Sequence, residues 1–339
     1  MRYGNDTNAI TPYPPLRRSL MPTLCIDFGG TEIKLGILDG PRILATTARV
    51  NSGSDADLDH VREALDELTE SAGRSDLDAV GIALPGVVDR FGGSLVAAHD
   101  KYGYALGRDL REWAAVSFGA PAVVENDARA ALVGETTYGV AAGARDAVLI
   151  TLGTGIGTAA LIDGHLLRGV HDHAGILGGH MTVDLDGPVC NCGNVGCAEA
   201  VASTWALQRD VAFDPDLASS SLGERAAQGR IGLRDLLEAR GEPQAGALFD
   251  RYLRAWGAAI VTLCHAYDPD VVIVSGGVMR SAAAILTPLA GYVDAHLWSS
   301  SHRPAFVTPD APEHSVLLGL SALAGHPGDR AATHRKDAP

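Results

Sequence analysis

The sequence has few positive charges and no long apolar runs, and each shortage excludes a class of binding partner. Lys and Arg together number 27 against 41 Asp and Glu, which gives a formal net charge of −14. A chain with that balance offers no broad basic face, so we expect no nucleic-acid partner. No uninterrupted apolar segment approaches the roughly 20 residues of a membrane-spanning helix, so we expect no membrane contact.

The first 21 residues lack the continuous apolar core of a secretory signal, and they are polar and rich in Pro. They predict a disordered lead-in over residues 1–21, within which Met21 is an alternative start to Met1. Without an export signal we expect a cytoplasmic protein. In that reducing compartment structural disulfides are disfavoured.

Cysteine is also scarce, with five in 339 residues, yet three of the five fall within eight positions: Cys190, Cys192 and Cys197. The spacing Cys190-x-Cys192 is not that of a C-x-x-C redox pair. Three thiols with His180, ten residues before Cys190, make a ligand set of the kind that zinc takes tetrahedrally. Free thiols in a glycine loop are the alternative.

Two common phosphate-binding motifs are missing. There is no G-x-x-x-x-G-K-[ST] loop, and Gly153-x-Gly155-x-Gly157 has the wrong spacing for G-x-G-x-x-G and runs into a strand-like segment. The chain instead repeats a glycine hairpin. Residues 24–40 predict a strand, a glycine turn and a second strand, and residues 151–164 align with 27–40 without gaps.

A third glycine turn follows the apolar segment 271–275 and leads into a predicted helix. Glycine turns after strands let a backbone approach a ligand closely, although tight hairpins alone explain them about equally well. Residues 55–73 and 247–270 predict two further helices, the second long, buried and ended by Asp-Pro. Cys25 and Cys264 lie in apolar patterns and are predicted core residues.

Five segments, in this order, resemble the ROK family of sugar kinases within the actin-like ATPase superfamily: DFGGTEIKLGIL (27–38), GIALPGVVD (81–89), VVENDARAAL (123–132), LGTGIGT (152–158) and CNCGNVGCAE (190–199). The resemblance covers residues 22–325. It implies an α/β fold of two ribonuclease-H-like domains that close over a cleft. Residues 22–130 would form the smaller domain and 131–312 the larger one, with a zinc loop at 180–197. A helix at 314–325 would return to the first domain.

The resemblance also implies ATP, Mg²⁺ and a structural Zn²⁺, with a sugar as substrate and a homodimer as the assembly. Asp27 would position Mg²⁺ through water beside Lys34, and Gly276 and Gly277 would lie against the adenosine. Backbone N–H groups of both hairpins would hold the phosphates, at Gly29, Gly30, Thr31, Thr151, Gly153, Thr154 and Gly155. The sugar contacts would come from Gly86, Asn126, Asp127, His180 and Glu199.

Asp127 is the residue implied as general base, since it would accept the proton of the attacking hydroxyl. From the residues alone, the competing interpretation is a helix N-cap, because Asp127 follows a strand and begins a helix. The zinc set would be His180, Cys190, Cys192 and Cys197, a closed site that fixes the loop carrying Glu199.

One position departs from the family pattern. Before the zinc His the family usually has Glu-x-Gly-His, whereas this chain reads HAGILGGH over 173–180. Direct register places Leu177 where the Glu belongs, and one inserted residue places Ile176 or Leu177 near it, so neither register supplies an acid. His171, Asp172 or His173 could supply the missing contact. The substrate therefore stays open.

Three alternatives to an ordinary hexose kinase follow from the same residues. A ROK-type sugar-binding repressor would need a winged-helix domain, for which the 22 residues before the first strand are too few. A non-catalytic sugar sensor is disfavoured by an intact Asp127. The third alternative is a kinase of an aminosugar or a cyclitol, which Leu177 makes worth testing.

Overall fold

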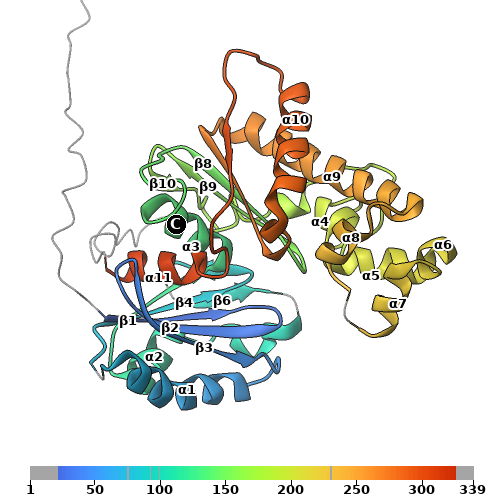
Figure 1. Cartoon of the computed structure of the whole chain (residues 1–339). Helices are drawn as coiled ribbons and strands as arrows, with labels where there is room; N and C mark the ends of the chain where they lie inside the picture. Colours follow the sequence, from blue (N-terminus) through green and yellow to red (C-terminus); the bar gives the residue numbers. More distant parts are fainter. Residues whose placement is uncertain (1–21, 75, 92, 99, 230, 326–339) are drawn as a thin grey trace, which may run out of the picture.

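The computed structural model describes residues 22–74, 76–91, 93–98, 100–229 and 231–325 (Figure 1). The predicted lead-in at 1–21, with Met21, lies outside the described residues. No helix in the described ranges is both long and apolar enough to cross a membrane.

Two five-stranded sheets share one topology, as the resemblance predicts. The order is β3-β2-β1-β4-β7 in the first and β10-β9-β8-β11-β12 in the second. Each begins with an antiparallel hairpin and continues with parallel strands. The first sheet comprises β1 (Pro22–Phe28), β2 (Glu32–Asp39), β3 (Arg42–Val50), β4 (Ala79–Leu84) and β7 (Ala122–Asn126). The second comprises β8 (Ala147–Leu152), β9 (Ile156–Ile162), β10 (His165–Leu166), β11 (Val271–Ser275) and β12 (Ala305–Val307).

The gapless match of the two hairpins is wrong beyond the turn. Phe28 pairs with Ile33 across a four-residue turn, whereas Leu152 pairs with Ile156 across a three-residue turn. The first strand and the start of each turn correspond, but the second strands are displaced by one residue. A gapless alignment cannot detect this, because both turns open on a glycine.

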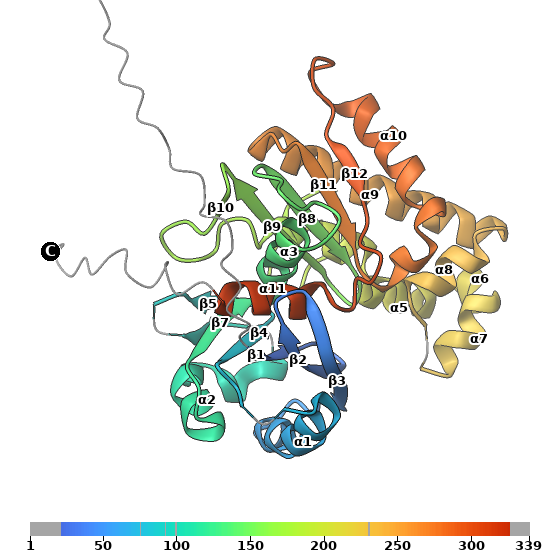
Figure 2. The same cartoon turned by 60° about the vertical axis from the view of Figure 1, so that its left-hand side comes forward.

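Two helices lie between the sheets, α3 (Asp127–Thr137) and α11 (Ser315–Ala324) (Figures 1 and 2). Small apolar residues of α3, including Ala128 and Ala131, join a core cluster with the strands of the second sheet. Its Ala130 packs instead with Leu317 and Leu320 of α11, in a cluster that includes β1 and β4. The start of α3 therefore lies where the two halves of the molecule meet.

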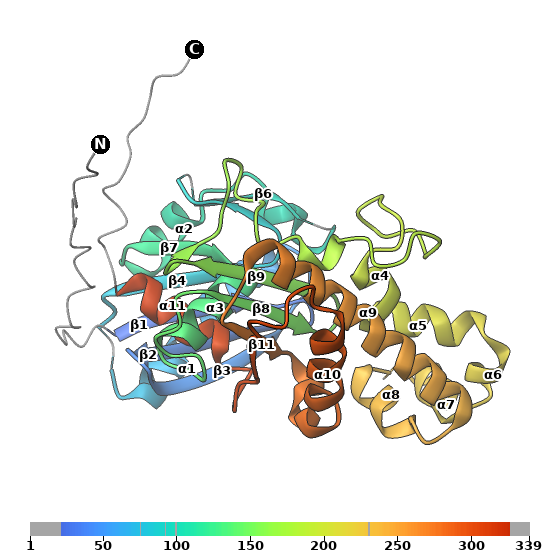
Figure 3. The same cartoon turned by 90° about the horizontal axis from the view of Figure 1, so that it is seen from above.

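The remaining helices cover the outer faces. The first sheet carries α1 (Ala56–Ala72) and α2 (Leu110–Phe118), and a short ribbon of β5 (Val87–Asp89) and β6 (Ser94–Ala97) stands beside it. The second sheet carries α9 (Pro243–Tyr267) and α10 (Leu286–His296). A smaller group projects to one side (Figure 3): α4 (Ala198–Ala202), α5 (Thr204–Phe213), α6 (Pro215–Ala218), α7 (Ser221–Ala227) and α8 (Leu233–Ala239).

The predicted helices are confirmed, with shifted ends. The helix expected at 55–73 is α1, which ends at left-handed Gly73, and the long one is α9, which begins four residues before the predicted start at 247. The turn after β11 leads first into a 3₁₀ helix, η3 (Gly277–Ala284). Cys25 and Cys264 are buried in the cores, as predicted.

Candidate active site

The carboxyl edge of the first sheet brings together three predicted site residues, Asp27, Gly86 and Asn126. Strands β1, β4 and β7 are parallel, and Asp27, Ala83 and Glu125 stand in one row across them. The turns that follow these strands therefore adjoin. Gly86 has φ +106°, and a Cβ there would clash with the carbonyl oxygen of Ala97. Its own carbonyl accepts a hydrogen bond from Asn126 Nδ2 at 3.1 Å.

The N-cap role belongs to Asn126 and not to Asp127. The Asn126 side chain accepts from Arg129 N–H at 3.1 Å, and Asp127 is the first residue of α3. Asp127 Oδ1 accepts from the Ala128 N–H at 2.8 Å and lies 3.0 Å from Asn126 Nδ2. Burial raises the pKa of Asp127, and these hydrogen bonds act in the opposite direction. Its carboxylate is thus held at the meeting point of the two halves.

Asp27 brings a second carboxylate close to Asp127. Its side chain is 6% exposed, and burial raises its pKa to about 7, with repulsion from Asp127 adding to the rise and attraction by Lys34 opposing it. Lys34 stands opposite Asp27 in β2. Two nearby carboxylates that both resist ionisation form a place where a cation is favoured.

The first glycine turn is held by two residues that sequence reasoning missed, Asn51 and Tyr102. The Tyr102 hydroxyl lies 2.7 Å from the carbonyl oxygens of both Phe28 and Gly29, and Asn51 Nδ2 donates to the Gly29 carbonyl at 2.7 Å. Asn51 Nδ2 also lies 2.9 Å from the Tyr102 hydroxyl. Only long-range contacts identify this pair, since they are 22 and 73 residues from Gly29.

The second glycine turn is held by Glu199 and the residues after it. Glu199 accepts from the Ile156 N–H at 2.8 Å and from the indole N–H of Trp205 at 3.3 Å. The Thr204 N–H donates to the Gly153 carbonyl at 3.0 Å. Trp205 was not predicted. Both carboxylate oxygens of Glu199, the expected sugar contact, are thus engaged by this hairpin and its support.

Both hairpins approach the start of α3. Asp127 acts electrostatically on Asp27 of the first hairpin, and the Ala128 side chain lies 3.5 Å from where a Cβ on Gly157 of the second would stand. Thr31 and Thr154, in the two turns, are exposed and do not enter a core. Gly30 is likewise exposed, while Gly29, Gly153 and Gly155 are half-buried. The Thr151 hydroxyl accepts from the Gly157 N–H at 3.1 Å, so it braces its own hairpin.

The third glycine turn adjoins the second hairpin. Ser275 at the end of β11 pairs with Thr151 in β8, so both strands end at the same edge. Gly276 has φ +110°, and a Cβ there would clash with the Leu152 carbonyl. The predicted adenosine contacts, Gly276 and Gly277, therefore lie beside a predicted phosphate turn.

The predicted metal set converges. The ligand atoms of His180, Cys190, Cys192 and Cys197 all lie within 4.8 Å of one another. Cys190 Sγ is 3.6 Å from His180 Nδ1, and Cys192 Sγ is 3.7 Å from Cys197 Sγ. Zinc–sulfur bonds of about 2.3 Å place tetrahedral thiolates roughly 3.8 Å apart, so the cluster fits a zinc ion. Cys197 is also the N-cap residue of α4, the helix that carries Glu199.

The departure from the family pattern lies at the surface of the protein. Leu177 is 42% exposed, whereas Ile176 is 7% exposed and packs inside. Of the residues that could replace the missing acid, Asp172 is buried and paired with Arg90, Nε to Oδ1 3.4 Å. His171 and His173 are exposed.

Comparison with known proteins agrees with this geometry. The model of the ROK family matches residues 23–326. A glucokinase of Thermotoga maritima is 32% identical over 270 residues, which cover 78% of this chain and 84% of that protein. The ROK family glucokinase of Streptomyces griseus, solved with glucose and AMPPNP, superposes with a TM-score of 0.77 at 32% identity, over 89% of this chain and 99% of that one.

A repressor is also similar to this chain. The xylose repressor of Bacillus subtilis is 25% identical over 253 residues, which cover 73% of this chain and 61% of the repressor. The family match spans nearly all the described residues, and the fold and the cysteine cluster agree with it. This chain belongs to the ROK family.

Proposed function

We propose that this protein is an ATP-dependent sugar kinase in which Asp127 is the general base. The observation that carries the proposal is the position of Asp127, at the start of α3, with the first hairpin at its side and the second against Ala128. Phosphoryl transfer needs the phosphates held and the attacking hydroxyl deprotonated in the same place. Two glycine hairpins around one carboxylate meet both needs.

Each group of residues then has one task. Backbone N–H groups of the two turns hold the phosphates, and Gly276 and Gly277 line the adenosine side. Asp127 accepts the proton of the sugar hydroxyl, and its raised pKa brings its basicity closer to neutral pH, where a general base works best. Asn126 caps α3 and fixes the peptide next to Asp127.

Mg²⁺ would be held near Asp27, where it would neutralise charge on the phosphates. The proximity of two buried carboxylates supports a cation there. Lys34 beside Asp27 adds a second positive charge on the phosphate side.

A structural zinc ion would be held by His180 and the three cysteines. His180 faces Cys190 through Nδ1, so its Nε2 is on the opposite side of the ring from the thiols. We propose that this nitrogen meets a sugar hydroxyl. Glu199 remains a proposed sugar contact as well, although its contacts in the structure are with the second hairpin and Trp205.

The substrate class follows from Leu177. Its exposed apolar side chain stands where the family usually presents an acid, so a hexose loses one charged acceptor on that side. We propose a hexose-like substrate with fewer hydroxyls or an apolar substituent there, which includes aminosugars and cyclitols. The cytoplasmic location and the homodimer stay predictions.

The test is a coupled ADP-release assay with Mg-ATP against hexoses, N-acetylhexosamines, aminosugars and cyclitols. We expect sugar-dependent ADP release with at least one member of this panel. A non-catalytic sensor or regulator would bind a sugar in calorimetry without releasing ADP, and that result would replace the kinase assignment.

A further inference from the structure

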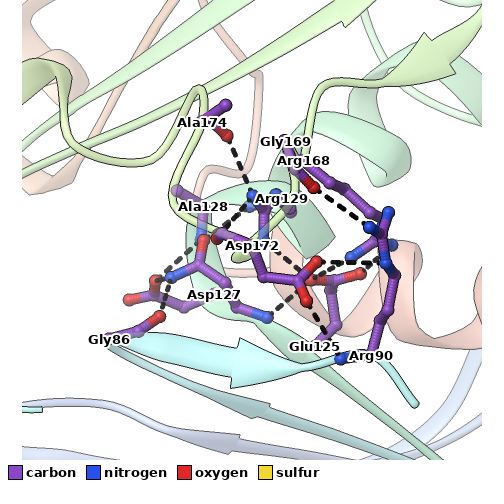
Figure 4. Close-up of polar contacts among 11 residues, drawn as sticks. Gly86, Arg90, Glu125, Asp127, Ala128, Arg129, Arg168, Gly169, Asp172 and Ala174 are labelled. Atoms are coloured by element: carbon purple, nitrogen blue, oxygen red, sulfur yellow. Dashed lines mark hydrogen bonds and ion pairs between the residues drawn. The ribbon is translucent and has the colours of Figure 1, made fainter. Parts of the chain in front are cut away.

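Five charged side chains form a cluster along α3 from Asp127, and the proposed chemistry gives them no role (Figure 4). They come from both halves of the molecule. Arg90 follows β5, Glu125 lies in β7, and Arg129 lies in α3, while Arg168 and Asp172 belong to the loop between β10 and η2 (Gly178–His180). The cluster therefore joins this loop, residues 168–174, to the first sheet.

Ion pairs tie the 168–174 loop to β7 of the first sheet and to the segment after β5. Arg168 pairs with Glu125, and its Nη1 donates to Glu125 Oε1 at 3.2 Å. Arg90 Nε lies 3.4 Å from Asp172 Oδ1, and Arg90 Nη2 donates to the Gly169 carbonyl at 3.0 Å. These contacts make the position of the loop depend on side chains outside its own sheet.

Arg129 fixes the centre of the loop. Its side chain is fully buried, and its Nη2 donates to the carbonyls of Asp172 and Ala174, each at 2.9 Å. Its Nη1 lies 3.7 Å from Glu125 Oε1. A buried guanidinium is costly, and the hydrogen bonds to these two carbonyls and the nearby Glu125 carboxylate offset that cost. Here it holds the residues on both sides of His173.

Asp172 and the segment after the loop are equally constrained. Asp172 has φ +59°, a left-handed conformation that persists in a non-glycine residue when its surroundings over-determine it. Its carboxylate is paired with Arg90 and its carbonyl with Arg129, so it is not available to a ligand. Farther on, the Thr158 hydroxyl donates to the Gly175 carbonyl at 2.7 Å and accepts from the Gly178 N–H at 2.8 Å.

Two exposed imidazoles of this loop remain open to a ligand. His171 and His173 are both exposed, with ring centroids 6.4 Å apart. His173 is the one whose two neighbours are both held by Arg129, from the same turn of α3 that carries Asp127. An imidazole can donate or accept a hydrogen bond, so it can meet a hydroxyl that a carboxylate would otherwise bind.

We propose that His173 is a specificity-determining residue that hydrogen-bonds a hydroxyl of the substrate, and that Arg129 is a positioning residue acting through it. This inference rests on the proposed kinase function. His173 would supply the contact that Leu177 lacks, and it would select sugars by an imidazole where the usual family pattern has an acid.

The experiment measures KM for the best sugar and for ATP in the full chain and in His173→Ala. A neutral hydrogen bond is worth a factor of roughly three to ten, so the sugar KM should rise by about that factor while the ATP KM stays the same. His165→Ala, an exposed histidine in β10, is the matched control and should change neither constant. An unchanged sugar KM in His173→Ala overturns the inference.

Arg129→Met tests the positioning role. If Arg129 acts through His173, the double variant His173→Ala/Arg129→Met should have the same sugar KM as His173→Ala alone. If Arg129 has an independent structural role, the increases in sugar KM of the two single variants should multiply in the double variant. Should Arg129→Met fail to fold, Arg129→Lys replaces it, because lysine keeps the positive charge but lacks the planar guanidinium that binds the two carbonyls. Absence of ADP release with every sugar in the wild-type chain would overturn the kinase function itself. Normal wild-type turnover together with sugar KM effects that multiply in the double variant would overturn only the role of Arg129.

Discussion

The two glycine hairpins share a topology but are stabilised by different chemistry. The Gly29 carbonyl of the first is bound by a phenol and an amide, Tyr102 and Asn51, both neutral. The Ile156 N–H of the second is bound by a carboxylate, Glu199, whose helix has Cys197 of the cysteine cluster as its N-cap residue. The first hairpin is therefore held by hydrogen bonds from its own half, and the second by the helix that follows the cysteine loop.

The strands before the two turns also differ, because a charged residue in the first stands where the second has a neutral one. Asp27 stands two residues before Gly29 and is a buried carboxylate, whereas Thr151 stands two residues before Gly153 and turns its hydroxyl to Gly157. The buried carboxylate of the first hairpin, Asp27, lies in its strand, whereas the carboxylate at the second, Glu199, lies in the helix that supports it. Perturbing each charge should separate the contributions of the two hairpins to catalysis.

The largest expected effect comes from Asp127, which the two hairpins share. Asp127→Asn should lower kcat by about 10²–10⁴-fold and keep ATP binding, because a general base contributes that factor and Asn126 still caps the helix. Asp109→Asn is the control, since Asp109 caps α2 and Asn is an equally good cap. Near-normal turnover would remove Asp127 from the mechanism.

The next largest effect is expected from disrupting the cysteine cluster, which should perturb the second hairpin and not the first. Cys192→Ser should abolish binding of one zinc per chain and destabilise the protein by several kcal/mol, because a closed zinc site contributes to folding. The ATP KM should rise as well, since Cys197 is the N-cap residue of the helix that carries Glu199. Metal analysis and thermal unfolding test this, with Asn191→Ser as the control. A zinc-free protein of unchanged stability and activity would contradict it.

The stability of the protein should depend on pH through Asp27, the buried carboxylate of the first hairpin. Burial raises the pKa of Asp27 to about 7 in the folded chain from its ordinary value of 3.8, so the folded state binds more protons between those values. Stability should therefore fall as pH rises from about 4 to about 7. Asp27→Asn removes this loss, and without Mg-ATP it should be more stable than wild type at pH 8 by on the order of 2–4 kcal/mol. Denaturant unfolding at pH 5 and pH 8 measures the difference; an equal difference at both pH values would count against the buried carboxylate.

Substitution of Glu199 separates its two proposed roles. Glu199→Ala leaves the Ile156 N–H unpaired, and loss of a charged acceptor should raise the ATP KM about ten- to hundredfold. Glu199→Gln keeps an acceptor oxygen and should do less to the ATP KM. If Glu199 instead acts mainly on the sugar, the sugar KM will rise in both variants while the ATP KM stays the same.

The local features of this site could be predicted from the sequence, and its supports could not. The glycine turns, the cysteine cluster and the strand before Asp127 are contiguous motifs, so their residue types and spacing were informative. Asn51, Tyr102 and Trp205 act on peptides distant in the sequence, and nothing in their own neighbourhoods indicates a partner. The one-residue difference between the turns was hidden for a related reason, because only strand pairing shows where each turn ends.

The smallest effect is expected at the support of the first hairpin. Tyr102→Phe removes the hydroxyl but keeps the buried ring, and Asn51 still binds the Gly29 carbonyl. A neutral hydrogen bond of about 0.5–1.5 kcal/mol predicts a two- to tenfold rise in the ATP KM. Tyr104→Phe, whose hydroxyl contacts Asp57, is the matched control and should leave the ATP KM unchanged. A larger effect than that of Glu199→Ala would reverse the comparison between the hairpins.

The claim that both hairpins hold one nucleotide is tested most directly by a crystal structure with Mg²⁺ and a non-hydrolysable ATP analogue. The account predicts one triphosphate within hydrogen-bond distance of backbone N–H groups in both turns, 29–31 and 153–155, with the Asp127 carboxylate on the γ-phosphate side. A triphosphate that contacts one turn only, or that lies away from Asp127, would contradict it.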